Sequence, residues 1–202
     1  MKRSILLVTG GAALLVLTAA CGQQTDDRVD TTEADASTSV ESQIAAQAPY
    51  ITLDCTSLQV SPVDEPPASG VTIGSATALF QPNGAPAITI ATDAAPATEL
   101  GVADIQEGEG DPVQAGDTVT VNYCGVGYGG QTVFDSSWTR GEPATFPLEG
   151  LIQGWQDGIP GMKAGGQRLL EIPGELAYGE TGTQGIGPNE TLVFVIELMS
   201  IG

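Results

Sequence analysis

The sequence predicts an α+β fold, in which a curved antiparallel sheet holds one short helix. Segments 119–124, 168–172 and 191–198 carry patterns of apolar residues that are typical of strands. Segment 151–159 carries apolar residues at helical spacing instead. A short helix held against the sheet would bury this apolar stripe, which places the fold in the α+β class.

Residues 49–96 predict a β-rich extension that precedes the main domain at 97–202. Segments 50–53 and 87–90 alternate like short strands, and proline and glycine interrupt the chain between them. We interpret the extension as a layer packed on the main domain. The alternative is an independent binding module, although so short a segment would have a thin core.

The strand and helix segments of the main domain differ in the faces that they bury. In segment 119–124 the alternation places Val121 and Tyr123 on one face and Cys124 on the other. In the helical segment, Ile152, Trp155 and Ile159 form the apolar stripe. Segment 168–172 is a further strand. Segment 191–198 is apolar on both faces, which predicts a central strand.

Charge and composition exclude several classes of function. The chain has 25 acidic residues against 6 basic residues, and it contains no histidine. The acidic excess disfavours nucleic acid and anionic headgroups as partners. The lack of histidine removes Ser-His-Asp and Cys-His catalysis and the usual zinc sites, and we expect neither a metal nor a cofactor.

Residues 1–20 predict a secretory signal peptide. Lys2 and Arg3 precede an apolar run, and small residues end the segment directly before Cys21. This ending resembles the lipobox of bacterial lipoproteins, in which the cysteine is lipidated and becomes the new N-terminus. Residues 21–48 contain almost no large apolar side chains, which predicts a flexible acidic tether. The expected location is therefore the bacterial cell membrane, lipid-anchored on the extracytoplasmic side. The alternative is a non-lipidated or uncleaved signal with an incidental cysteine.

Two further cysteines, Cys55 and Cys124, remain for the extension and the main domain. In an oxidising compartment an even pair favours a disulfide, which would fasten the extension to a strand of the main domain. Two unrelated thiols are the alternative, because the sequence does not give the distance between them.

Five short blocks follow one another in the C-terminal half. They are VNYCG at 121–125, VFDSS at 133–137, LIQGW at 151–155, AYG at 177–179 and TLVF at 191–194. In their order and intervals they resemble the FKBP-type peptidyl-prolyl cis/trans isomerases. The resemblance covers 98–202, about half of the chain, and it is specific because five blocks agree in order and spacing.

The resemblance implies a half-barrel sheet around the helix, with an aromatic pocket for the substrate proline between them. It implies catalytic roles for Tyr123, Phe134, Asp135 and Tyr178. It implies that substrate is bound by Arg140, Phe146, Leu151, Ile152, Trp155, Ile186 and Phe194. Trp155 would form the floor, while the Ile152 N–H and the Tyr178 hydroxyl would bond substrate carbonyls.

Three departures from the family's pattern affect ligand preference. Ala144 stands where an aromatic residue is common, Gly150 where a larger polar residue is frequent, and Gly187 where proline is common. They leave the implied proline pocket in place, but one of its walls is thinner.

The implied function is peptidyl-prolyl isomerisation in exported proteins. The partners would be exported polypeptides that contain proline, and macrolides are further ligands that the resemblance suggests. The alternative is a non-catalytic binding module or chaperone on the same fold. Rotation about the X–Pro amide needs no nucleophile or metal, so the lack of histidine is no objection.

Overall fold

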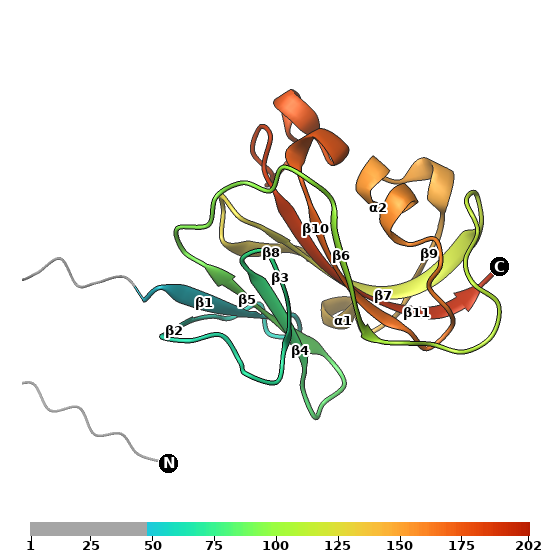
Figure 1. Cartoon of the computed structure of the whole chain (residues 1–202), viewed down its shortest axis with the longest axis horizontal. Helices are drawn as coiled ribbons and strands as arrows, with labels where there is room; N and C mark the ends of the chain where they lie inside the picture. The colour runs from blue at the N-terminus through green and yellow to red at the C-terminus, as the bar shows by residue number, and fades with distance from the viewer. Residues whose placement is uncertain (1–47) are drawn as a thin grey trace, which may run out of the picture. The chain divides into compact units, whose positions relative to one another are not determined.

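The larger of two antiparallel sheets contains all the strand segments predicted for the main domain. A computed structural model describes residues 48–202. The sheet is formed by β6 (Gly101–Gln106), β7 (Thr118–Gly127), β8 (Thr132–Ser136), β9 (Ala144–Pro147), β10 (Gln167–Ile172) and β11 (Leu192–Ile201). Its strand order is β6-β10-β11-β7-β8, and β9 pairs with β7 (Figure 1). The predictions for the signal peptide, Cys21 and all but the last residue of the tether lie outside the described residues.

Strand β11 lies between β10 and β7, which confirms the prediction of a central strand. Phe194 and Ile196 face one side of the sheet, and Val193 and Val195 face the other. Each set belongs to a separate hydrophobic cluster, because successive side chains of a strand point to opposite faces. The sheet therefore has a core on both of its faces.

The extension forms a second, smaller antiparallel sheet. Its strands are β1 (Tyr50–Asp54), β2 (Val60–Val63), β3 (Val71–Ile73), β4 (Ala76–Phe80) and β5 (Pro86–Ala91), in the order β2-β1-β5-β4-β3. The strands predicted at 50–53 and 87–90 are thereby confirmed, and they pair with each other through Ile51 opposite Ile90 and Leu53 opposite Ile88.

The smaller sheet shares a hydrophobic core with one face of the larger sheet. Leu53 and Ile88 from the smaller sheet belong to the same buried cluster as Val193 and Val195. The described residues all fall within one compact unit. The smaller sheet thus covers the face of the larger sheet that points away from α2 (Gln153–Gly158) (Figure 1).

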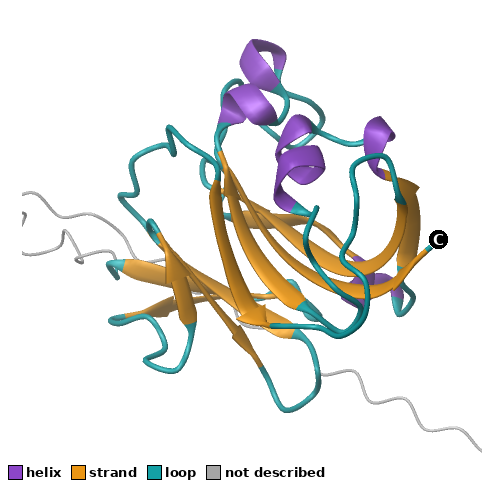
Figure 2. Cartoon of the chain, turned by 45° about the vertical axis from the view of Figure 1, so that its right-hand side comes forward, coloured by secondary structure: helices purple, strands orange, loops and turns teal. Residues whose placement is uncertain are grey.

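The expectation of one short helix is incomplete. Besides α2, the described chain contains the one-turn helix α1 (Ser137–Arg140) and three 3₁₀ helices, Leu148–Gly150, Gly174–Leu176 and Gly179–Thr181 (Figure 2). A single turn is too short to produce a periodic pattern, and α1 ends at Gly141, whose φ of 78° only glycine adopts freely. None of the helices within residues 48–202 has the length and apolar character needed to cross a membrane.

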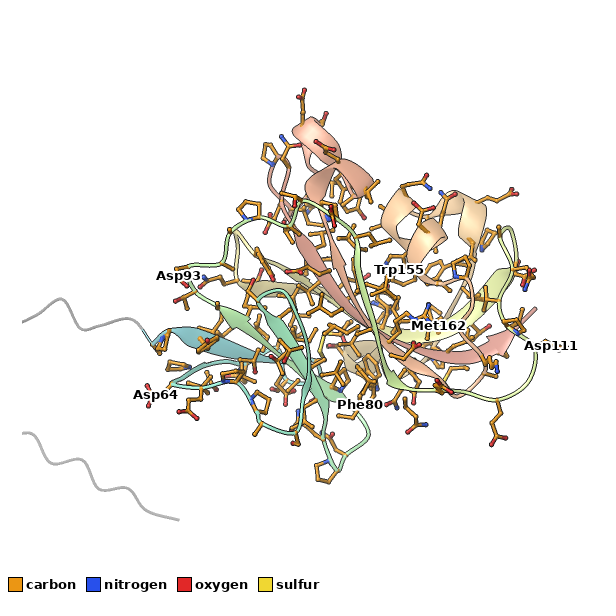
Figure 3. All side chains as sticks on the ribbon, in the orientation of Figure 1. Asp64, Phe80, Asp93, Asp111, Trp155 and Met162 are labelled. Atoms are coloured by element: carbon orange, nitrogen blue, oxygen red, sulfur yellow. A yellow bond between two sulfur atoms is a disulfide. The ribbon has the colours of Figure 1, made fainter. Side chains whose placement is uncertain are left out.

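Helix α2 lies directly on the larger sheet because two of its residues lack a side chain. A Cβ atom on Gly154 would lie 2.4 Å from Ile172 Cγ2, and one on Gly158 would lie 2.9 Å from Leu170 Cδ2. Both distances are shorter than atomic contact allows. The close approach brings Trp155 down between α2 and the strands (Figure 3).

Candidate active site

Trp155 forms the centre of a cluster of aromatic rings. It projects from α2 and is 4% exposed. Its ring meets those of Phe194, Tyr123 and Phe146 edge to face, with centroids 5.2, 5.5 and 6.2 Å apart. This geometry places the positive edge of one ring against the negative face of the next, which fixes the orientation of the rings.

A cavity of about 190 Å³ opens among these rings. It is lined by Tyr123, Phe134, Asp135, Phe146, Leu151, Ile152, Trp155, Tyr178 and Phe194. An apolar cavity of about 150 Å³ is large enough to take a benzene ring, so a five-membered prolyl ring has room here. The rings leave most of the lining apolar.

Gly125 makes room for two of the walls. The Phe134 and Phe194 rings pack edge to face, with centroids 5.6 Å apart. A Cβ atom on Gly125 would lie 2.5 Å from Phe134 Cζ and 2.7 Å from Phe194 Cε1. A side chain at this position would therefore push both rings into the cavity. The sequence analysis did not identify Gly125 as a site residue, although glycine within a strand is a signal of close approach.

A polar group of three side chains borders the aromatic cavity. The Tyr123 hydroxyl donates to Asp135 Oδ2 at 2.5 Å, and Arg140 donates to Asp135 Oδ1 through Nη1. Arg140 Nη2 also donates to the Tyr123 hydroxyl at 2.9 Å, and its guanidinium lies over the Tyr123 ring. Burial, followed by the bond to Asp135, raises the pKa of Tyr123 above its usual value, so the phenol stays protonated at neutral pH. We refer to Tyr123, Asp135 and Arg140 as the polar triad.

Two hydrogen-bond donors lie at the rim. Tyr178 is 40% exposed, and its side chain borders the opening. Ile152 precedes the first residue of α2, and its backbone N–H donates no hydrogen bond within residues 48–202. A free donor at a helix start is available to an incoming carbonyl.

Two of the residues implied by the resemblance lie outside the cavity lining. Ile186 is buried in the same hydrophobic cluster, in a loop closed by the Thr183–Ile186 bridge. Arg140 donates to Asp135 and borders a neighbouring cavity. The other nine implied residues all line the aromatic cavity.

Comparisons with known proteins agree with this arrangement. Residues 110–199 match the family model of the FKBP-type peptidyl-prolyl cis-trans isomerase. An FK506-binding protein of Streptomyces anulatus is 47% identical over 110 residues, which cover 52% of this chain and 89% of that protein. The chain belongs to the FKBP-type peptidyl-prolyl cis-trans isomerases.

In two longer members of the family, the stretch that matches the chain has about the length of this domain. FkpA of Escherichia coli is 48% identical over 97 residues, covering 48% of this chain and 36% of FkpA. The isomerase Mip of Coxiella burnetii is 50% identical over 98 residues, covering 48% of this chain and 42% of Mip. Each of these matches covers about half of this isomerase. The resemblance recognised from the five sequence blocks covers a similar share of the chain.

The disulfide between Cys55 and Cys124 is formed in this isomerase. The two Cα atoms lie 5.9 Å apart, and the bond joins the end of β1 to β7 across the shared core. Of the two alternatives that the sequence left open, the structure contains the bridge.

Proposed function

We propose that the aromatic cavity around Trp155 is the site where this isomerase binds and twists proline. The observation that supports the proposal is a largely apolar, ring-lined cavity of prolyl size with hydrogen-bond donors at its rim. Trp155 serves as the floor, Phe134, Phe146 and Phe194 as walls, and Leu151 and Ile152 as part of the rim. The curved sheet and α2 together act as the half-barrel that holds these walls in place.

The mechanism follows from the electronic structure of the amide. Rotation about an X–Pro bond meets a barrier of roughly 18–20 kcal/mol, because the planar amide loses resonance when it twists. An apolar cavity removes the water that stabilises the charge-separated planar form, and it binds the twisted form more tightly than either planar one. The Ile152 N–H and the Tyr178 hydroxyl orient the flanking carbonyls.

The polar triad holds Asp135 next to the twisting amide. Its carboxylate already accepts bonds from Tyr123 and Arg140, so its orientation is fixed before substrate arrives. Fixed dipoles need no reorganisation during the reaction, which is the source of their catalytic effect. Ile186 belongs to the loop closed by the Thr183–Ile186 bridge, which would cover the bound proline.

Isomerase activity should be nearly independent of pH between about pH 6 and pH 9. The raised pKa of Tyr123 keeps its phenol neutral throughout this range. A proton-trapped or protease-coupled assay with a proline tetrapeptide measures kcat/KM across the range, and FK506 added to the same assay tests for macrolide competition. A steep bell-shaped profile, or the absence of turnover, would contradict the proposal.

The clients that we propose are exported polypeptides, since slow prolyl steps limit folding after translocation. The signal-like segment 1–20 and the cysteine at position 21 support an exported, lipid-anchored protein on the extracytoplasmic side of a bacterial membrane. The Cys55–Cys124 disulfide agrees with this location, because such bonds persist in oxidising compartments. Residues 21–48 would tether the isomerase to the membrane.

Replacing Cys21 by serine should release the isomerase from the membrane. Lipid attachment needs the thiol of Cys21, and the serine hydroxyl does not substitute for it. The wild-type chain should sediment with membranes of a lipoprotein-processing bacterium and incorporate labelled palmitate, whereas Cys21→Ser should do neither. Equal membrane association of the two proteins would count against lipidation.

A further inference from the structure

A second cavity, of about 180 Å³, adjoins the aromatic cavity and is lined in part by β8 and α1. The two cavities share Phe134 and Asp135 as lining residues. The second cavity is bordered by Val133 from β8 and by Leu58 from the extension. Leu58 is 46% exposed, so the extension presents a large apolar side chain to solvent beside the proposed site. We call residues 55–59 the Leu58 loop.

Three bonds from Cys55 fasten the Leu58 loop to β7, β8 and α1, which carry the polar triad. Its sulfur is bonded to Cys124, and its carbonyl accepts hydrogen bonds from Ser136 Oγ at 2.7 Å and Thr139 Oγ1 at 3.2 Å. Each of these three partners is the immediate sequence neighbour of a member of the polar triad. The position of the Leu58 loop is therefore fixed relative to Tyr123, Asp135 and Arg140.

Leu58 adopts an unfavourable backbone conformation at this position. Its φ is 57°, in the left-handed region that leucine rarely occupies and that glycine or asparagine adopts more easily. Hydrogen bonds hold the turn: Leu58 N–H donates to the Asp54 carbonyl at 2.9 Å, and Asp54 Oδ1 accepts from the N–H groups of Thr56 and Ser57. The turn thus keeps a bulky apolar residue exposed where a smaller or polar one would be less strained.

We propose that the Leu58 loop is a substrate subsite that binds an apolar side chain near the isomerised proline. The inference rests on the proposed site around Trp155. Leu58 and Val133 supply the apolar surface, and the edge of Phe134 forms a common wall with the aromatic cavity. Leu58 is then a specificity-determining residue contributed by the extension.

The occupant is the same polypeptide whose proline occupies the aromatic cavity. An extended chain advances about 3.3 Å per residue, so a side chain within about three positions of the proline reaches a cavity that shares two lining residues with the first. A tetrapeptide with alanine at its other positions offers no large apolar side chain to this subsite. The Leu58 loop therefore favours substrates with a large apolar side chain near proline and leaves the turnover of the alanine-containing tetrapeptide unaffected.

The test compares wild-type full-length protein with Leu58→Asn, using two kinds of substrate. Asparagine tolerates a positive φ, so this variant should be at least as stable as the wild type while it lacks the apolar surface. The substrates are a proline tetrapeptide with alanine at its other positions and a set of nine-residue peptides. Each nine-residue peptide has leucine at one of the three positions before or after proline and alanine elsewhere, and the reference peptide has alanine at all of these positions. Line-shape NMR measures isomerisation of all of them.

In the wild type, leucine at one position should raise kcat/KM by about three- to tenfold over alanine. Leu58→Asn should lose this preference and keep the tetrapeptide rate. Val102→Asn is the matched control, because Val102 is 45% exposed on β6 at the opposite edge of the sheet, and it should keep the preference. An unchanged preference in Leu58→Asn with normal tetrapeptide turnover would overturn the subsite alone. No turnover of the tetrapeptide by the wild type would overturn the proposed site as well.

Discussion

Replacing Trp155 by alanine should reduce kcat/KM toward a proline tetrapeptide by about a hundredfold or more. The indole contacts three other rings of the cavity, so its loss removes the floor and allows the walls to shift. The same substitution should lower the free energy of unfolding by about 3–5 kcal/mol, because it leaves a void in the core. The value of kcat/KM is measured under conditions in which the variant is fully folded, and the free energy of unfolding is measured by urea unfolding.

The other tryptophan of the chain provides the control for this substitution. Trp138 belongs to α1 and packs against Phe80 of the smaller sheet, with ring centroids 6.0 Å apart. Trp138→Ala should also destabilise the fold, but the folded protein should keep its tetrapeptide turnover within about twofold. Trp155→Ala with turnover close to that of the wild type would show that proline binds elsewhere.

The strand pattern could be predicted because it is encoded locally, and the aromatic set could be predicted because five blocks of the sequence resemble those of a known family. The alternation of Val193, Phe194, Val195 and Ile196 determines which side chains share a face, wherever the strand is placed. Trp155 is recognisable through its place in the block LIQGW. The strand pattern depends on neighbouring residues only, whereas the aromatic set follows from the resemblance, and the structure contains both.

The position of the Leu58 loop could not be predicted, because it depends on how two sheets pack. Cys55 and Ser136 are 81 residues apart in the sequence, yet their groups are hydrogen-bonded. For the same reason, the sequence alone did not decide whether Cys55 and Cys124 form a disulfide or remain two separate thiols. The resemblance placed Ile186 at the aromatic cavity, but its side chain is buried in the neighbouring core and does not line the cavity. The sequence of the loop does not specify which of its side chains reach the cavity. No local pattern encodes such contacts.

Removing the disulfide should lower the free energy of unfolding by about 4 kcal/mol, in the double variant Cys55→Ala/Cys124→Ala or by reduction. The bond joins residues 69 positions apart, so it strongly restricts the unfolded chain. Urea unfolding of oxidised, reduced and double-variant proteins measures the effect. Equal midpoints for the oxidised and reduced proteins would contradict it.

The loss of the disulfide should also impair the proposed Leu58 subsite while the aromatic cavity keeps its activity. Without it, the hydrogen bonds from Ser136 and Thr139 to the Cys55 carbonyl still join the Leu58 loop to β8 and α1. Ser136→Ala removes one of these bonds with the disulfide intact and should cost about 1 kcal/mol, with the substrate preference retained. The reduced protein is assayed without urea and at a temperature below its unfolding midpoint, so that it stays folded. It should turn over the tetrapeptide normally but lose the preference for leucine-containing peptides. That outcome would make the oxidised bond, which persists in an oxidising environment, a condition for full substrate selection.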